Sequence, residues 1–338
     1  MECHRDLTLK KRPHHTLPGS RWRRKQTKIV TKDKTTYVFS SKTAPIERVR
    51  TGESVLLKTE DAFGGQITTE NAKVDALDWS RVNGATGPIF VEGAEPGDTL
   101  VTEILNVKTE KRGVIAAIPK HGVLGKKQFR CATRQVQIRG SKIHFGDSVW
   151  LNSEPMIGTI GVAPAEGEIP TGFLGRHGGN MDVKDTCAGA KLYLPVFVKG
   201  ALFAAGDLHA VQADGELCVS AIEAAGEVLL NFQLLKHRTP EWPVLETKRE
   251  YAILACGESL DEAAESAADA ATRALMREYG WPFEEAYMFG SLAVDLRINQ
   301  VVDPLKGVRA VISKDFVGLK GLLEPRTHLK QNGAHAEM

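Results

Sequence analysis

Side chains able to bind a metal ion or to transfer protons gather in one stretch of the sequence, between residues 177 and 223. Imidazole, carboxylate and carboxamide groups recur there at short spacing, in His177, Asn180, Asp182, Asp207, His209, Glu216 and Glu223. Nitrogen and carboxylate ligands suit Zn²⁺ first, with Ca²⁺ or another divalent ion as the alternative. On a strand, Asp207 and His209 would share one face about 7 Å apart, close enough to contact one ion.

A metal site of this kind would carry out hydrolysis. Three protein ligands leave a metal with an open position, where a water molecule loses a proton near neutral pH. A nearby glutamate would then act as general base and general acid. The same residues also allow a simpler interpretation, in which an Asp/His pair on a hairpin is only solvated or hydrogen-bonded and binds no metal.

The segment from 207 to 223 has the pattern of a β-hairpin that would position these groups. Asp214-Gly215 is a strong signal for a two-residue turn between alternating runs. Such a turn places His209 opposite Ser220, and one face of the hairpin then holds Asp207, His209, Glu216, Cys218 and Ser220. A β-bulge would bring Glu223 to that face instead.

Short runs of β-branched, aromatic and alternating residues fill most of the chain before residue 200. They predict strands near 35–39, 53–57, 87–91, 99–107, 136–139, 157–162 and 192–198. Pro195 favours an edge strand or a bulge for the last of these. Segments 61–66 and 177–182 contain adjacent glycines and are predicted to be loops. Asp61 and Gln66 lie in the first loop, where they either line a pocket or only shape the turn.

Helical patterns are confined to the region near the C-terminus. Ser259 and Glu262 form a capping box, and alanine and leucine then recur at helical spacing up to Gly280. A second helix is predicted from Phe283 to about Arg297. The sequence therefore predicts a mainly β protein with a helical section at about 259–297.

Several longer strings resemble the acetamidase/formamidase family. They are DAFGGQI (61–67), TGPIFVEGAEPGDTL (86–100), IGTIGVAP (157–164), HGGNMD (177–182), the whole of 187–223, and DLRINQVVDP (295–304). The resemblance spans roughly residues 35–315, in the family's order. It implies hydrolysis of short aliphatic amides such as formamide or acetamide with a divalent metal, and a homo-oligomer. It also implies a jelly-roll-like β-sandwich with a barrel-like part and a smaller C-terminal α/β section.

The resemblance further implies roles for individual residues. The metal ligands would be Asp182, Asp207 and His209, and the proton would move through Glu216 or Glu223. An oxyanion would receive a hydrogen bond from His177 or Asn180. The amide substrate would contact Asn180, Asp61 and Gln66. The family's glycine before Asp214 is Ala213 in this chain, a change that affects the turn.

Two rival functions stay open at this stage. The chain could be a non-catalytic β-sandwich binding protein of the same fold, which fold alone cannot separate from an enzyme. It could also be an amidase with Cys187 as nucleophile, although nothing in the sequence gives that thiol a base. Five cysteines without a CxxC pair argue against a disulfide framework and a thiolate zinc site.

Charge is distributed unevenly along the 338 residues. The chain carries 44 Lys/Arg and 42 Asp/Glu, yet residues 1–34 hold eleven basic and three acidic residues. We expect a flexible basic tail at 1–34, a catalytic domain at 35–322 and a polar tail at 323–338. The basic tail could instead be a nucleic-acid-binding arm, a targeting peptide or an over-long start.

Composition also limits the partners. The body of the chain is mildly acidic, which makes nucleic acid a poor candidate and leaves a small-molecule amide as the expected partner. No run of about 18 apolar residues exists to span a membrane, and no secretory signal precedes the body. We therefore expect a cytoplasmic location and no membrane partner.

Overall fold

A curved nine-stranded sheet is the largest element of the computed structural model, which describes residues 27–70, 72, 74, 77–146 and 148–325. In spatial order its strands are β1 (Lys28–Val30), β5 (Ser54–Thr59), β18 (Gly226–Leu235), β7 (Thr99–Thr109), β16 (Lys191–Pro195), β20 (Val244–Glu246), β21 (Glu250–Gly257), β23 (Lys306–Ser313) and β22 (Val294–Gln300). The late strand β18 lies between β5 and β7 and pairs antiparallel with both. The sheet thus joins distant parts of the chain.

A second sheet packs against the first. Its order is β14 (Leu174–Gly175), β15 (Gly178–Asn180), β12 (Met156–Gly161), β17 (Phe203–His209), β6 (Ala85–Val91) and β2 (Thr35–Thr36), and β4 (Glu47–Val49) also pairs with β6. Buried residues of both sheets, such as Val55, Leu230, Ile157 and Ile160, form one apolar core. Phe203 and Phe232 meet across it edge to face, with ring centroids 4.9 Å apart.

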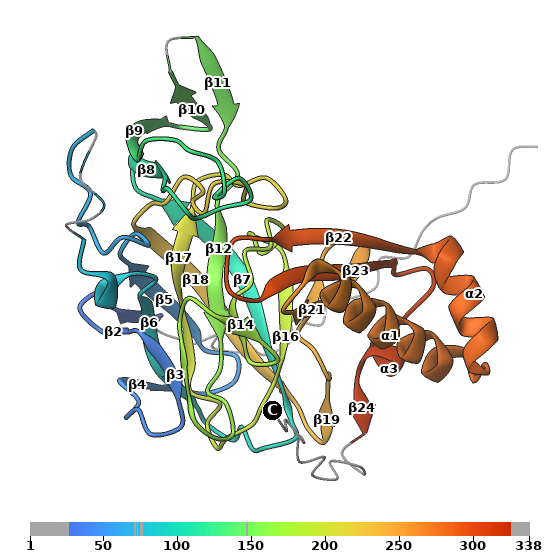
Figure 1. Ribbon diagram of the computed structural model, residues 1–338. Helices are drawn as coiled ribbons and strands as arrows, with labels where there is room; N and C mark the ends of the chain where they lie inside the picture. Colours follow the sequence, from blue (N-terminus) through green and yellow to red (C-terminus); the bar gives the residue numbers. More distant parts are fainter. Residues whose placement is uncertain (1–26, 71, 73, 75–76, 147, 326–338) are drawn as a thin grey trace, which may run out of the picture.

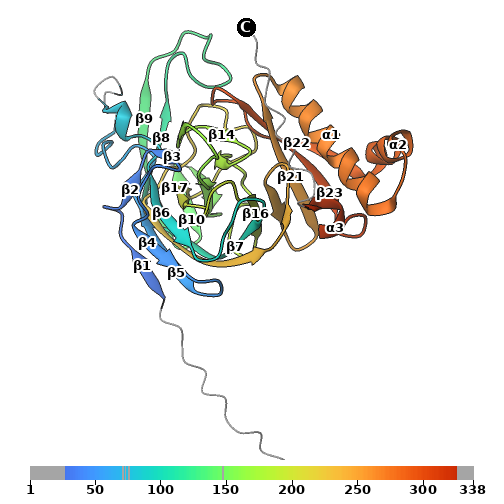
Figure 2. The same cartoon turned by 90° about the horizontal axis from the view of Figure 1, so that it is seen from below.

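Smaller sheets extend this β-sandwich (Figures 1 and 2). A four-stranded sheet projects from one end and consists of β8 (Arg112–Ala117), β9 (Ala132–Arg139), β10 (Lys142–Phe145) and β11 (Val149–Asn152). Two-stranded pairs join β3 (Val38–Ser40) to β13 (Glu168–Pro170) and β19 (Arg238–Thr239) to β24 (Glu324–Pro325). The predicted mainly β class is confirmed, although the described strands close into no barrel.

The C-terminal section adds helices to one face of β21 and β23 (Figure 2). In helix α1 (Leu260–Tyr279) the Ser259 hydroxyl accepts a hydrogen bond from the Glu262 N–H, and Gly280 ends the helix at φ +74°. Buried alanines of α1 pack on Ile253 and neighbouring strand residues. Short helix α3 (Leu319–Leu322) packs beside α1. These contacts confirm the smaller α/β section.

Helix α2 (Phe283–Ala293) is shorter than predicted. The chain from Val294 onward forms strand β22, paired antiparallel with β23, instead of continuing the helix to Arg297. The alternation of Val294, Leu296 and Ile298 suits a strand whose alternate side chains share one face. Pairing with β23 therefore decides this boundary.

The predicted two-residue hairpin turn at Asp214-Gly215 is wrong. Strand β17 ends at His209, which pairs with Glu223 and not with Ser220, and β18 begins only at Gly226. The Asp214 carboxylate accepts two hydrogen bonds from Arg309, at 2.9 and 3.0 Å, and the Gly215 N–H donates to Asn299 O. The turn residues thus fasten a long loop to β23 and β22.

Two smaller expectations were also wrong. The loop predicted at 177–182 contains strand β15, which pairs with both β12 and β14. Pro195 marks neither an edge nor a bulge, because β16 is a central strand and Pro195 is its last residue. The pairing with β20 already ends at Tyr193, so the missing N–H of Pro195 breaks no bond on that side.

The described residues 27–34 of the expected N-terminal tail belong to the fold, since β1 pairs with β5. Likewise, Glu324 and Pro325 of the expected C-terminal tail form β24. Residues 1–26 and 326–338 lie outside the described part of the chain. No helix in the described ranges is long and apolar enough to cross a membrane.

Candidate active site

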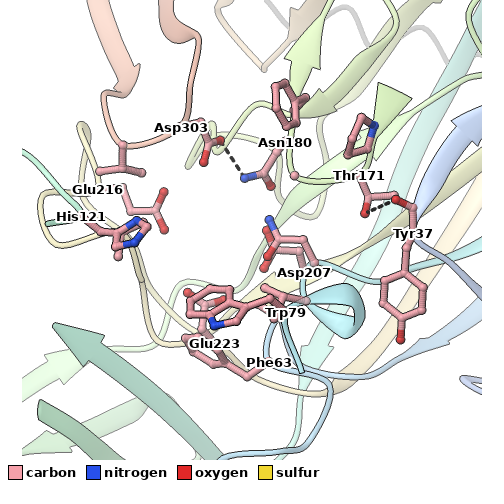
Figure 3. Close-up of a pocket in the computed structure, with 18 of the residues that line it drawn as sticks. Tyr37, Phe63, Trp79, His121, Thr171, Asn180, Asp207, Glu216, Glu223 and Asp303 are labelled. Atoms are coloured by element: carbon pink, nitrogen blue, oxygen red, sulfur yellow. Dashed lines mark hydrogen bonds between the residues drawn. The ribbon is translucent and has the colours of Figure 1, made fainter. Parts of the chain in front are cut away.

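A cavity of about 480 Å³ opens where the second sheet meets the loops at one end of the sandwich (Figure 3). Its polar lining includes Asn180, Asp207, His209, Glu216, Glu223 and Asp303. Aromatic rings line other parts of the wall, among them Tyr37, Phe63, Trp79 and Phe173. Residues scattered over more than 250 positions of the sequence therefore converge on one pocket.

His209, at the end of β17, is the centre of the polar cluster. Its Nε2 lies 3.2 Å from Asp207 Oδ1, 3.0 Å from Glu223 Oε2 and 3.9 Å from Asp182 Oδ1. Its Nδ1 lies 2.7 Å from Oε1 of Gln212, whose own amide donates to the Asp182 carbonyl at 2.8 Å. That donated bond fixes the Gln212 orientation, so Nδ1 carries a proton and Nε2 faces the carboxylates.

Burial dominates the electrostatics of this cluster. It raises the pKa of Asp182 and Glu216 well above the usual carboxyl range and raises the pKa of Glu223 to about 7. Burial acts the same way on Asp207, but the positive charge of His209 outweighs it and lowers that pKa. Burial opposes protonation of His209, yet Glu223 and Asp207 raise its pKa. The centre thus favours a positive charge among its carboxylates.

The residues present fit a divalent cation. Both carboxylate oxygens of Asp182 are buried and have no hydrogen-bond partner among the described residues. Ligand atoms of Asp182, His209 and Glu216 lie within 4.8 Å of one another, as do those of Asp207, His209 and Glu223. Nitrogen and carboxylate donors in such a group are those that Zn²⁺ and related ions bind.

Gly158 of β12 is required for this arrangement. A Cβ at that position would lie 2.5 Å from Asp207 Oδ2 and 2.6 Å from Asp182 Oδ1. Any larger residue would therefore push apart the two carboxylates that converge on His209. The backbone of β12 forms the floor against which both acids pack.

Three acids of the centre have left-handed backbones. The φ angles are +46° at Asp182, +55° at Asp207 and +46° at Glu216. For a residue other than glycine this conformation costs about 1–2 kcal/mol, and it recurs at functional sites. Asp207 is held in it inside β17, between residues that pair normally with β12. The surrounding sheet thus maintains the strained geometry.

Asn180 and Asp303 form a second polar pair in the cavity. The Asn180 amide donates to Asp303 Oδ2 at 2.9 Å and its carbonyl accepts from Thr159 at 2.5 Å. Burial raises the pKa of Asp303 to about 7. Gln300, the last residue of β22, accepts from the Asp303 N–H and so positions this acid. Asp303 lies in the DLRINQVVDP string, which was the available signal for it in the sequence.

Four of the predicted site residues lie outside the cavity lining. Asp182 is one of them and is buried with its Oδ1 3.9 Å from His209 Nε2. The His177 ring packs edge to face on Phe39, and burial lowers its pKa to about 4. Asp61 lines a separate cavity of about 340 Å³. Gln66 bonds the Phe63 carbonyl and the Asp78 main chain, which shapes the loop.

Sequence reasoning missed several residues of the site. Gln212, Thr159 and Gly158 act on the acids or on His209, and Trp79 and His121 stack at the cavity wall with ring centroids 6.2 Å apart. Gly158 and Thr159 lie in the IGTIGVAP string, which was the available signal for them. Cys187 is half-buried, and burial raises its pKa, which disfavours a thiolate nucleophile.

A buried carboxylate–imidazole centre at the base of an open cavity is an arrangement that hydrolytic enzymes use, and it favours an enzyme of that class. The model of the Acetamidase/Formamidase family matches residues 31–171 and 169–313. The chain belongs to this family.

Solved structures and curated relatives agree with this assignment. An acetamidase from Bacillus halodurans is 38% identical with a TM-score of 0.84, covering 85% of this chain and 98% of that one. A Thermoanaerobacter tengcongensis protein described as a predicted acetamidase/formamidase is 39% identical with a TM-score of 0.85, covering 88% and 98%. The formamidase of Methylophilus methylotrophus is 27% identical over 339 residues, 76% of this chain and 83% of that protein. The chain spans 62% of the length of a Schizosaccharomyces pombe relative that is 27% identical over 252 residues.

Proposed function

We propose that this chain is a metal-dependent amidohydrolase that cleaves short aliphatic amides of the formamide or acetamide kind to a carboxylate and ammonia. The observation that carries the proposal is the group of buried acids around His209 Nε2, with both Asp182 oxygens lacking a hydrogen-bond partner among the described residues. The names of the relatives supply the substrate class.

Asp182, Asp207 and His209 are the ligands we propose for the ion, with Zn²⁺ the first candidate. Asp182 Oδ1 and Asp207 Oδ2 both border the space beside Gly158, and His209 Nε2 faces both acids. A divalent cation at this position supplies Lewis acidity, which polarises an amide carbonyl and makes water more acidic. Glu216 also lies within ligand distance of Asp182 and His209, so it is the alternative ligand.

The proton transfers fall to a glutamate. We propose Glu223 as this base, because it lines the cavity with its Oε2 3.0 Å from His209 Nε2, where it can accept a proton from water and return it. The attacking water forms the new C–O bond, and the proton that it gave up returns to the amide nitrogen as the C–N bond breaks, which releases ammonia and leaves a carboxylic acid. The acid then gives its remaining proton to ammonia or to solvent, so the final products are carboxylate and ammonium. We propose Asn180 as the hydrogen-bond donor to the developing oxyanion, because its amide lines the cavity and only one of its N–H groups is used by Asp303.

Two substitutions distinguish a residue that binds the metal from a residue that acts as general base. We expect Glu223→Gln to abolish turnover while the purified protein keeps its metal, and Glu216→Gln to lower metal content if that residue is a ligand. The measurements are metal content by mass spectrometry of elements and ammonia release from formamide and acetamide. Asp315→Asn, which changes an exposed acid after β23, is the matched control.

Two results would contradict the proposal as a whole. One is a protein that contains no divalent metal and gains no activity when metal is added. The other is a metal-loaded protein that releases no ammonia from any amide with one to four carbons, which would favour the non-catalytic binding protein. We also propose a cytoplasmic location, which the free thiols of Cys131, Cys187, Cys218 and Cys256 support.

A further inference from the structure

The cavity at the proposed site is much larger than formamide or acetamide. Its volume is about 480 Å³, within the range of about 300–1,000 Å³ that encloses drug-sized ligands. Both amides contain only a few non-hydrogen atoms, and a water molecule occupies about 30 Å³ in the liquid. A small amide bound beside His209 would therefore leave most of the cavity to water, whereas a larger acyl group would fill it.

Apart from the acids, the cavity wall is largely aromatic and aliphatic. Figure 3 shows the rings of Tyr37, Phe63 and Trp79 around the same space as Asp207 and Glu223. Aliphatic side chains complete the lining, among them Val82, Ile118, Val219 and Val302. Such a wall binds apolar groups by removing them from water, and its rings add stacked or edge-to-face contacts with a flat ligand ring.

The charges of the lining disfavour one kind of acyl group. Four carboxyl groups line the cavity, those of Asp207, Glu216, Glu223 and Asp303, whereas no lysine or arginine of the described ranges does so. The amide end of a substrate would use the proposed cation. A carboxylate elsewhere on the substrate would then lose its hydration without gaining a cationic partner, which weakens binding. The cavity therefore favours a neutral acyl group.

Trp79 is held in place at the cavity by its neighbours. It begins the short 3₁₀ helix η2 (Trp79–Arg81), where the Asp78 carboxylate accepts a main-chain N–H at 3.1 Å. The Gln66 side chain bonds both main-chain groups of Asp78, at 2.8 and 3.2 Å, and the Trp79 ring stacks on His121. The ring is nevertheless 49% exposed, which leaves area for a ligand to cover. A ring fixed in this way loses little conformational freedom when a ligand packs on it.

We propose that this cavity recognises neutral primary amides whose acyl part ends in a flat apolar ring, and that Trp79 determines this specificity. The inference rests on the proposed function, because that function places the amide group beside His209. The ligand ring would then lie against Trp79 and Phe63, and small amides would be poorer substrates of the same site. Phenylacetamide, in which a methylene group joins the amide to a phenyl ring, is the simplest probe of this class.

The first test measures binding without turnover, by calorimetry on the Zn²⁺-loaded Glu223→Gln variant. We expect the Kd of phenylacetamide to be about tenfold or more below that of acetamide, because burial of a Phe-sized group is worth a factor of this order. Adding Trp79→Ala should remove most of the difference. Adding Trp150→Ala should preserve it, since this change truncates another half-exposed tryptophan that also lies against a histidine ring. Circular dichroism verifies that each variant is folded. Equal binding of the two amides, or unchanged binding in Trp79→Ala, overturns the proposal.

The second test defines the ligand class with two relatives of phenylacetamide in the same assay. Cyclohexylacetamide has a ring of similar size that is not flat, and 4-carboxyphenylacetamide keeps the flat ring but adds a carboxylate. Both should bind more weakly than phenylacetamide, the second by about tenfold or more. Binding of either relative as tight as that of phenylacetamide shows that the class is wrong and overturns the proposal.

Turnover by the unmodified chain separates this inference from the proposed function. We expect kcat/KM for ammonia release to be about tenfold or more higher for phenylacetamide than for acetamide. Trp79→Phe, which keeps a ring, should retain more of this preference than Trp79→Ala. Hydrolysis of acetamide without a preference for phenylacetamide overturns the inference and leaves the proposed function standing. Selective binding of phenylacetamide without ammonia release from any amide contradicts the proposed function and supports the inferred ligand class.

Discussion

The acidic centre and the C-terminal section differ in almost every property that stabilises a fold. In the centre, Asp182, Asp207 and Glu216 have left-handed backbones, and Asp182 is buried without a partner among the described residues. In the C-terminal section, α1 begins at a side-chain cap, ends at a glycine and packs alanines on β21 and β23. One region holds geometry that its sequence disfavours, and in the other the ends and the packing of α1 agree with its sequence.

The difference shows where the molecule's stability originates. Local preference and packing agree in the C-terminal section and in the sandwich core, as they do in sequences that specify one fold. The centre departs from those rules because chemistry needs several ionisable groups in one buried place. A mutation should therefore affect stability or activity according to the region in which it falls.

Asp182→Asn should have the largest effect, and the effect should be on activity. Removing the charge takes away a proposed ligand, so we expect amide turnover to fall about 10³-fold, or about 4 kcal/mol, together with loss of metal. Metal-free stability should stay equal or rise, because a buried unpaired carboxylate is removed. Steady-state kinetics and urea unfolding in chelator measure both quantities. Clear destabilisation with retained turnover would mean that Asp182 is structural.

Ile253→Ala should lower the stability of the protein and leave its activity unchanged. This side chain is 4% exposed between α1 and the sheet, so truncation leaves a cavity and costs about 2–4 kcal/mol. Turnover per folded molecule should remain that of the unmodified chain. Urea unfolding and kinetics at a temperature where the variant is folded provide the check. A tenfold loss of turnover would show that the two regions are coupled.

His177 should make the free energy of unfolding decrease at acidic pH. Its folded pKa of about 4 lies below the ordinary 6.5, so the unfolded chain takes up the proton first as the pH falls. Its contribution to stability is complete above about pH 6.5, shrinks by about 2 kcal/mol near pH 5 and is lost toward pH 4. His177→Gln should flatten this part of the stability curve, whereas Ile253→Ala should lower the whole curve without changing its slope. An unchanged slope in His177→Gln contradicts the assignment.

Ser259→Ala should have the smallest effect. It removes the hydroxyl that accepts the Glu262 N–H at 3.2 Å, and losing such a cap costs about 1 kcal/mol. Replacing Ser259 by Thr, which keeps a hydroxyl, should restore most of the loss in thermal unfolding. No measurable change in Ser259→Ala would mean that packing alone holds this end of α1.

The sequence predicted correctly those features that depend on residues close together in the chain. The cap at Ser259 and the stop at Gly280 were readable because both act within one helical turn. The sequence could not show that Asp214-Gly215 forms no hairpin turn, because those residues are held by Arg309 and Asn299, which lie far along the chain. The end of α2 failed for the same reason, since β23 supplies the partner for Val294 onward.

The residue types in the sequence identified the acids of the site. They did not identify the residues that hold those acids in position. Asp182, Asp207 and His209 lie in polar strings, and the structure places them together with Glu216 and Glu223. Gly158 is needed because the carboxylates of Asp182 and Asp207 lie against it, and Gln212 contributes because its amide contacts His209. Both contacts exist only in the folded chain. His177 resembles a site residue in the sequence, but its ring turns toward Phe39.

The position of β18 affects how the chain is made. Strands β5 and β7 are synthesised early, yet the strand that fills the gap between them ends only at Leu235. A growing chain therefore carries two incomplete sheet edges through the synthesis of more than a hundred residues. Edges of this kind pair with whatever strand is near, and long-range pairing folds slowly. Folding during translation is thus delayed until a late insertion, and nascent chains cut short before β18 are the ones most prone to aggregate.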